Sequence, residues 1–416
     1  MSAFGFTFLV LLGLATALQL WLGARHIGYV LRHRDAVPGQ FSSEVSLDAH
    51  QRAADYTAAR TRFRLVSIVI DAGVVLWLTF GGGLQWLYDL AAGRMGPGIA
   101  REVSFVVLLS VVVTLIEVPQ SFYRTFVIEQ RFGFNKTTPA LFAVDLLKGV
   151  LVGVCLGIPL IAAILWLMQE VGSSWWLYAW LVVVFFSLFV TFIAPTVIAP
   201  LFNKFSPLDN LEIRDRVSRL LARCGFKVKA LMVMDGSRRS AHGNAYFTGF
   251  GNTKRIVFFD TLLARLTATE VEAVLAHELG HFKLKHVLKR LLLGFLLTLG
   301  FFFLLNYFMH EPWFYSGLGV TTQSTATALV LFYLVVPVFT FLLQPLSAMY
   351  SRKHEFEADR YAAEHASAGD LVSALVKLYK DNASTLTPDP VHSAFYDSHP
   401  PRSYESRGCR AQPDNF

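Results

Sequence analysis

The sequence predicts a mainly α-helical, polytopic membrane protein of about seven transmembrane helices with a small α/β insert. Of its 416 residues 54% are hydrophobic and only 16% are charged, which is too apolar for an ordinary soluble enzyme. The 36 Phe and 8 Trp are typical of a lipid-facing surface with interfacial anchors. One long polar segment, by contrast, alternates helical and β patterns, which indicates a folded unit outside the membrane.

Seven apolar segments reach the length of about 20 residues that a membrane-crossing helix needs. They are residues 4–23, 65–88, 103–122, 141–168, 175–199, 287–308 and 326–347. We interpret the first as a retained helix rather than a cleaved signal peptide, because no positive residue precedes it and the apolar run continues past Ala15 to Ala17.

These segments divide the chain into four parts. The predicted parts are an N-terminal membrane region of five helices at 1–199, an α/β segment at 200–286, two further membrane helices at 287–347 and a C-terminal tail at 348–416.

Basic residues concentrate in alternate loops. The loop after the first segment carries Arg25, Arg32, Arg34, Arg52, Arg60, Arg62 and Arg64. Because cytoplasmic loops are enriched in Lys and Arg, this alternation predicts an N-terminus outside and a C-terminus in the cytoplasm, in the inner membrane if the source is bacterial. The net charge of +7 is explained by these loops, so we expect the bilayer as a partner and no nucleic acid. Cys155, Cys224 and Cys409 are too widely spaced to predict a disulfide framework or a cysteine zinc site.

Residues 200–286 predict a small α/β unit. Helical spacing of apolar residues is seen in "NLEIRDRVSRLLARCGF", and a strand is predicted by "KALMVM". Two β-rich runs, "NAYFTGF" and "KRIVFFD", are joined by Gly251-Asn252-Thr253, which predicts a hairpin. The unit ends in "EVEAVLAHELGHFKL", a run of helical periodicity with Thr267 and Thr269 before it and Glu270 in its first turn.

The stretch "AHELGH" within this last helix has the spacing of a zinc site. His277 and His281 are four residues apart, so both imidazoles project from one helix face. In the H-E-x-x-H arrangement two such histidines bind zinc and the intervening glutamate, here Glu278, is the general base. The three fixed letters also occur by chance, but an apolar face on the same run favours a packed helix.

A catalytic zinc needs a third protein ligand besides water, and the C-terminal tail offers one. Its stretch "SRKHEFEADRYA" places Glu355 and Asp359 four residues apart on a helix that continues the last membrane segment. Glu355 is the candidate third ligand, and Asp359 is placed to accept the other ring N–H of a ligand histidine. The alternative is a solvated acidic face in which Glu355 and Glu357 pair with Arg352 and Lys353. The zinc motif favours the first interpretation.

Together, "AHELGH" and "SRKHEFEAD" resemble the motifs of the type I CAAX prenyl protease family, which are integral-membrane zinc peptidases. The segments "FGFNKTTPALFAVDLLKG", "APLFNKFSPL" and "HGNAYFTGFGNTKRIVFFDTLL" resemble that family as well, so the similarity covers nearly the whole chain. The resemblance implies a barrel of helices around a water-filled chamber, with the zinc site at its cytoplasmic end.

The resemblance also implies a role for each matching residue. His277, His281 and Glu355 become ligands of one zinc ion, Glu278 the general base and Asp359 a partner of a ligand.

The family's edge strand, which holds the substrate backbone extended by β-addition, is matched by Asn244, Ala245, Tyr246 and Phe247. Asn244 is then expected near the scissile bond.

A family motif of His-Pro-Pro followed by a basic residue is matched by "SHPPRSYESR". His399 is either a hydrogen-bond donor to the tetrahedral intermediate or a surface residue of a Pro-bounded turn. Arg402 and Arg407 are both candidates for the family's next arginine, and the stretch after Pro401 departs from the family pattern.

The function implied is a zinc endopeptidase that cleaves a peptide or protein substrate at the membrane, of the C-terminal CAAX type, with or without a prenyl group. A membrane-protein quality-control zinc peptidase shares the two core motifs and is the alternative within the same class. A metal transporter would need ligands within several membrane segments, and an inactive scaffold is disfavoured by the intact His and Glu set.

Other polar residues are assigned weaker roles. His242, His286 and His354 lie near the motifs in sequence and are predicted to be structural or exposed. Four ionisable residues within or near the apolar segments are expected to face the protein interior or water, either in a polar chamber or in helix–helix hydrogen bonds. These are Asp71, Glu117, Asp145 and Lys148.

Overall fold

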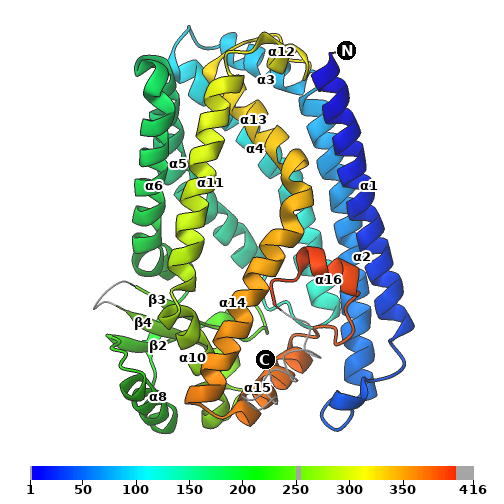
Figure 1. The fold of residues 1–416 in the computed structure, drawn as a ribbon, viewed down its shortest axis with the longest axis vertical. Helices are drawn as coiled ribbons and strands as arrows, with labels where there is room; N and C mark the ends of the chain where they lie inside the picture. Colours follow the sequence, from blue (N-terminus) through cyan, green and yellow to red (C-terminus); the bar gives the residue numbers. More distant parts are fainter. Residues whose placement is uncertain (1, 250–253, 400–416) are drawn as a thin grey trace.

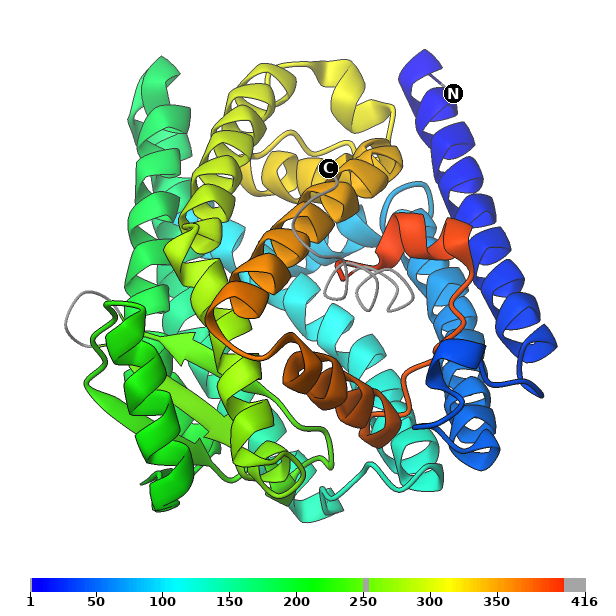
Figure 2. The same ribbon diagram turned by 60° about the horizontal axis from the view of Figure 1, so that its bottom comes forward.

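The computed structural model describes residues 2–249 and 254–399 and is mainly helical (Figure 1). Long apolar helices stand side by side as a wall, and a small sheet with its helices lies at one end of them (Figures 1 and 2). Six helices of the described part are long and apolar enough to cross a membrane, or up to seven if one bent pair counts as a single span. The predicted fold class is therefore confirmed.

Eight helices of the described residues build the wall. They are α1 (Ala3–Arg32), α2 (Leu47–Leu78), α3 (Gly83–Ala92), α4 (Ile99–Tyr123), α5 (Pro139–Glu170), α6 (Trp175–Ile193), α11 (His286–Phe308) and α13 (Thr325–Thr340).

The second span differs from the single helix predicted at 65–88. α2 starts well before residue 65 and is followed by α3 at an angle of 55°. The bend lies at Gly81 to Gly83, where Gly82 has a φ of 74° that residues with a Cβ rarely adopt, and a Cβ at Gly81 would lie 2.8 Å from the backbone of Trp77. Hydropathy marks the apolar part of a helix and not its polar extension or a glycine bend, which explains the difference.

The last span is also longer than its apolar part. After a short 3-10 turn at Phe341–Leu343, the chain continues as α14 (Gln344–His365), which carries Glu355 and Asp359 to the sheet end of the molecule (Figure 1). The predicted continuation of this span as a helix is therefore present, with a break in its middle.

The insert holds a four-stranded sheet in the order β1-β2-β4-β3. Its strands are β1 (Phe205–Pro207), β2 (Ala230–Met234), β3 (Ala245–Thr248) and β4 (Arg255–Phe259). β2 and β4 are parallel, whereas the β1–β2 and β3–β4 pairs are antiparallel. β3 is an edge strand: no other strand of the described residues pairs with its second side. The predicted hairpin turn, Gly251-Asn252-Thr253, lies outside the described residues.

Three helices pack with the sheet: α8 (Leu211–Arg223), α10 (Ala268–Lys283) and α15 (Ala368–Asp381). α10 begins at a capping box. The Thr267 side chain accepts a hydrogen bond from the backbone N–H of Glu270, and the Glu270 side chain accepts one from the backbone N–H of Thr267. The buried Glu270 carboxylate also accepts hydrogen bonds from Ser373 Oγ at 2.7 Å and Lys377 Nζ at 2.8 Å, which ties α15 to α10. α10 ends where Lys285 takes a φ of 58° and the chain turns into α11.

Ion pairs within the described part of the chain connect the wall with the parts that follow it, and two of them position the insert and the tail. Arg239 of the insert binds the Asp145 carboxylate of α5 through two nitrogens, at 2.8 and 2.9 Å. Asp389 binds Arg25 of α1 at 3.0 Å, which places α16 (Pro390–Tyr396) beside α1 and directs the chain toward His399. Asp145 therefore forms a structural ion pair between the wall and the insert.

Candidate metal centre

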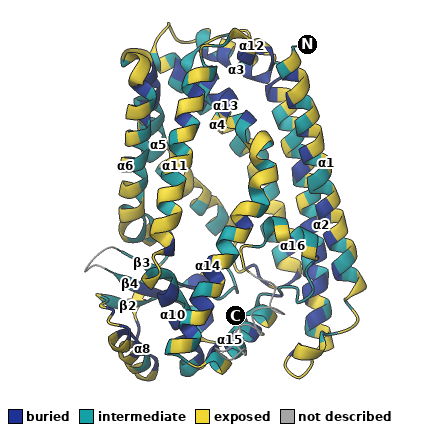
Figure 3. Cartoon of the chain, viewed as in Figure 1, coloured by how far each residue is buried: buried dark blue, intermediate teal, exposed yellow. Residues whose placement is uncertain are grey.

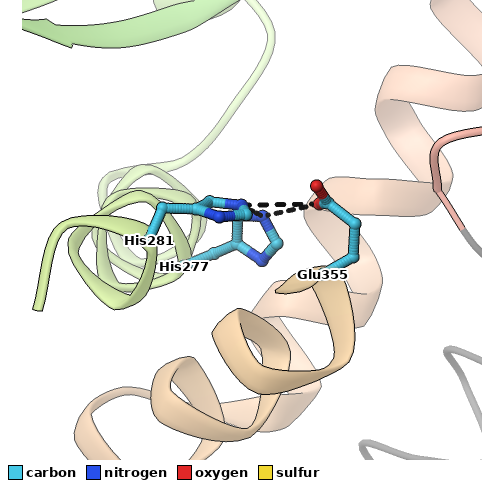
Figure 4. A group of neighbouring side chains, drawn as sticks. All are labelled: His277, His281 and Glu355. Atoms are coloured by element: carbon cyan, nitrogen blue, oxygen red, sulfur yellow. Dashed lines mark hydrogen bonds and ion pairs between the residues drawn. The ribbon is translucent and has the colours of Figure 1, made fainter. Parts of the chain in front are cut away.

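The two histidines of the motif lie on successive turns of α10 and face α14 (Figure 4). α10 and α14 approach closely because Gly280 has no side chain: a Cβ there would lie 3.0 Å from the Cα of Ala358. This close approach brings Glu355 against His277 and His281. Three potential metal ligands from two helices thus meet at one point.

The ligand atoms have the spacing of a zinc site. The Nε2 atoms of His277 and His281 are 3.2 Å apart, and Glu355 Oε2 lies 3.5 and 3.4 Å from them (Figure 4). A tetrahedral zinc with ligands at about 2.0–2.2 Å separates its ligand atoms by about 3.3–3.6 Å. A hydrogen bond between the two imidazoles would explain the first distance, but the buried Glu355 Oε2 then has no hydrogen-bond partner. The donor set therefore fits a metal ion.

The second nitrogen of each imidazole is held by a different partner. His277 Nδ1 lies 2.8 Å from Asp359 Oδ1. His281 Nδ1 lies 3.0 Å from the Nδ1 of His286, whose Nε2 lies 2.8 Å from Glu357 Oε2. If both Nε2 atoms are kept free for a metal, His277 donates its Nδ1–H to Asp359, and His281 donates to His286, which donates to Glu357. Every proton in the set then has one acceptor.

His286 belongs to the site, although the motifs of the sequence do not reveal it. The prediction for this residue is a structural or exposed role, yet it is buried, contacts a candidate ligand and stacks on His354 with ring centroids 4.1 Å apart. No spacing rule indicates this contact, because the left-handed turn at Lys285 lies between His286 and the motif helix. From the sequence, Glu357 is likewise expected only as a surface ion-pair residue.

Charge around the two helices favours a cation. Burial alone would lower the pKa of His277, but the hydrogen bond to Asp359 and the close Glu355 carboxylate outweigh it and raise this pKa to about 10. Carboxylates that stabilise a proton here also stabilise a metal cation. Burial raises the pKa of Glu278 above its ordinary value, while the neighbouring histidines oppose the shift. A carboxylate with a raised pKa is a better proton acceptor, as a general base requires.

The structure brings His399 to the same place. Its Nε2 lies 3.2 Å from Glu355 Oε2, although most of its side chain is exposed. It lies just beyond α16, so its position depends on the docking of α16 on α1. Arg402 and Arg407 lie outside the described residues.

The predicted substrate-binding stretch lies beside the motif helix. Ala245 of β3 shares one core cluster with Ala276 of α10, and the Phe247 ring packs against Phe282 of α10. Tyr246 packs its ring edge-on against Phe259, and Asn244 is exposed just before the strand. The side chains of the strand are thus used for packing, and its second edge remains available for a peptide.

Comparisons with known proteins agree with this geometry. Residues 26–204 match the family model described as CAAX prenyl protease N-terminal, five membrane helices, and residues 207–404 match the model of peptidase family M48. The chain belongs to peptidase family M48. This confirms the family that the motifs resemble.

The relatives of this M48 peptidase match it over most of their length. The CAAX prenyl protease 1 homolog of Arabidopsis thaliana is 35% identical over 382 residues, which is 88% of each chain. CAAX prenyl protease 1 of Saccharomyces cerevisiae is 31% identical over 393 residues, or 88% of this chain and 86% of the relative. The crystal structure of S. mikatae Ste24p superposes with a TM-score of 0.92 at 27% identity, covering 99% of this chain and 100% of that chain.

The M48 peptidase is therefore a multi-pass membrane metallopeptidase that acts on a peptide or protein substrate. The predicted enzyme class is confirmed.

Proposed function

We propose that this M48 peptidase is a zinc endopeptidase in which His277, His281 and Glu355 hold one zinc ion. The observation that carries the proposal is the convergence of these three ligand atoms at distances of 3.2–3.5 Å. Asp359 and His286 support it, because each occupies the second nitrogen of one histidine and so orients its ring.

Zinc, when bound, lowers the pKa of a coordinated water from about 15.7 toward 7 and polarises the scissile carbonyl. Glu278 accepts the proton that the attacking water loses and delivers it to the leaving amine. His399 Nε2, beside the metal ligands, donates a hydrogen bond to the carbonyl oxygen as that oxygen gains negative charge. Asp359 keeps the His277 ring in the tautomer whose Nε2 faces the metal.

The substrate is proposed to bind along β3. Asn244 to Phe247 present the free edge of the sheet beside the metal centre, and an extended peptide can add to it as a further strand. We propose a C-terminal CAAX-type peptide as the substrate, with a prenyl group on its cysteine, because the curated relatives are named CAAX prenyl proteases.

Two observations bear on the alternative functions. In the described part of the chain, two groups of side chains could hold a metal ion. One consists of His277, His281 and Glu355, and the other, beside it, of His286, His354 and Glu357. Both lie at the sheet end of the molecule, whereas a transporter needs a series of sites along the membrane spans. A quality-control peptidase remains the rival within the same class, and the substrate experiment distinguishes it.

We further propose that the sheet end lies in the cytoplasm and that α1 begins outside, in the inner membrane if the source is bacterial. The start of α1 and the sheet lie at opposite ends of the wall (Figure 1). The loop between α1 and α2 lies at the sheet end (Figure 1). The basic residues of this part of the sequence lie in the loop or on the adjoining parts of α1 and α2, which supports a cytoplasmic sheet end by the positive-inside rule.

The test is to incubate the purified protein with a farnesylated CAAX peptide and with its unprenylated twin, and to map the cuts by mass spectrometry. A chelator should abolish cleavage and added zinc should restore it. We expect faster cleavage of the farnesylated peptide. Equal cleavage of both twins and of an unfolded membrane segment would favour quality control, and chelator-resistant cleavage would contradict the zinc site.

A further inference from the structure

A polar cavity of about 460 Å³ lies next to the metal centre. α1, α2, the turn after α15 and the segment after α16 all contribute to its lining. His399 is one of the lining residues, and its Nε2 is 3.2 Å from Glu355 Oε2. The cavity therefore opens at the proposed site of bond cleavage.

The direction of β3 indicates which part of a substrate reaches this cavity. Antiparallel pairing is slightly more stable than parallel pairing, so we expect an added peptide to run antiparallel to β3. The part of the peptide toward its C-terminus then passes the start of the strand, at Asn244 and His242. His242 Nδ1 lies 3.0 Å from Asn382 Oδ1, and Asn382 lines the cavity. The residues that follow the scissile bond are thus directed into the cavity.

The cavity presents one permanent cation. Arg60 of α2 is the only Lys or Arg among its lining residues. Its guanidinium carbon lies 5.2 Å from the ring centroid of Tyr56, a contact that orients the exposed side chain. Among the described residues no carboxylate lies within ion-pair distance of Arg60. The nearby Glu129 carboxylate accepts instead from the Tyr56 hydroxyl, at 2.7 and 2.8 Å.

One acidic residue, Asp397, also lines the cavity. It is two residues before His399 in the sequence, and its negative charge acts on His26 of α1, which also lines the cavity. Arg352 of α14 holds this segment by donating to the Asp397 carbonyl at 2.8 Å. Arg60 is therefore the lining residue that favours an anionic group.

We infer that this cavity is the subsite for the C-terminal end of the substrate, and that Arg60 binds the terminal α-carboxylate. The inference rests on the proposed function and deepens it, because it explains how the site would select peptide C-termini over internal segments. The volume lies within the range of about 300–1,000 Å³ that is usual for small-ligand pockets, so it accommodates a short peptide end and no folded chain. Arg60 is a specificity-determining residue in this scheme and takes no part in bond cleavage.

The test uses the full-length, zinc-loaded protein in proteoliposomes and two peptides that differ only in a C-terminal acid or amide. We expect the wild type to prefer the acid by about tenfold or more in kcat/KM, the effect of one lost charged hydrogen bond. Arg60→Gln should remove this preference through KM, with kcat little changed. Arg60→Lys should retain part of it, because the charge remains. Arg62→Gln, which changes an exposed charge on the same helix outside the cavity, should retain all of it.

Three results would overturn the inference. Equal cleavage of the acid and the amide peptide by the wild type would contradict the carboxylate subsite and leave the proposed peptidase function untouched. If the wild type cleaves neither peptide, the proposed function is contradicted as well. If Arg60→Gln lowers kcat/KM equally for both peptides, and does so only in anionic lipid, then Arg60 binds a lipid headgroup instead.

Discussion

The membrane wall and the α/β insert are stabilised by different interactions. The outer surface of the wall exposes many apolar residues (Figure 3). No residue of the most apolar window of the α6 span is buried, and Phe185 is 73% exposed. In the insert, apolar side chains of the sheet and helices face one another, and Ile256 and Phe258 are fully buried. The wall has a buried core between its helices as well, which includes Phe8 and Trp175, but its outer apolar surface depends on lipid. The insert buries its apolar side chains against one another.

This difference shows why the metal centre lies at the boundary of the two regions. α10 is fixed in the insert by the capping box and by Glu270, while α14 is a continuation of the last membrane span. The wall brings one helix to the site and the insert brings the other. Substitutions of polar groups at this boundary should have large effects, and substitutions on the lipid-facing surface should have small ones.

The largest effect is expected for Glu278→Gln at the boundary. The amide keeps the size of the side chain but accepts no proton, so kcat should fall by about 10²–10⁴-fold. Bound zinc, measured by atomic absorption, should be unchanged. Glu272→Gln on the same helix, which removes only ion pairs with Arg216 and Arg223, is the control and should remain active. Near wild-type turnover of the Glu278 variant would exclude this residue as the base.

Asp359→Asn should have the next largest effect. The variant loses the carboxylate that accepts the Nδ1–H of His277, so zinc affinity should fall by about 10–100-fold. Competition with a chromophoric chelator measures this change. Glu364→Gln, an exposed substitution closer to the end of α14, should bind zinc as the wild type does. Unchanged affinity in the Asp359 variant would mean that the ring of His277 is held by packing alone.

Glu270→Gln tests the anchoring of α10 within the insert. The variant weakens the hydrogen bonds that the Glu270 carboxylate accepts from Lys377 and Ser373, so the free energy of unfolding of the insert should fall by about 1–3 kcal/mol. Denaturant titration followed by protease protection of the insert measures the difference.

The same carboxylate gives a pH dependence with a defined sign. Burial alone would raise the pKa of Glu270, but hydrogen bonds from Lys377, Ser373 and Thr267 outweigh it and hold the pKa below its ordinary value. Its contribution to stability is therefore complete above the ordinary pKa of a glutamate and is lost as the pH falls through the lowered value. The Gln variant should lack this acid-sensitive component. An identical acid profile in both proteins would assign the transition to other groups.

The smallest effect is expected on the lipid-facing surface of the wall. Phe185→Leu exchanges one apolar group for another against lipid chains, so stability should change by no more than about 0.5 kcal/mol. Phe258→Leu, the same substitution in the core of the insert, should cost roughly 1 kcal/mol or more, because it leaves a cavity. Equal effects at both positions would contradict the comparison of the two regions.

Much of the fold could be predicted from the sequence because membrane spans and short helices have local patterns. Apolar runs of sufficient length located the spans, and short β-rich runs located the strands that the structure shows as β2, β3 and β4. The bend between α2 and α3 and the break before α14 were not predicted, because hydropathy averages over positions such as Gly82 where one dihedral angle changes the direction of the chain.

The amino-acid sequence alone places His277 and His281 on one helix face, because a spacing of four residues is close to one helical turn, and places Glu278 one residue further round the helix. It also singled out Glu355 and Asp359. Helix packing in the folded chain brings Asp359 to His277, 82 residues away in the sequence, and brings His286 and Glu357 to His281. It also decided that Arg60 shares a cavity with His399. Such contacts depend on how helices pack, and helix packing has no signature within a short stretch of sequence.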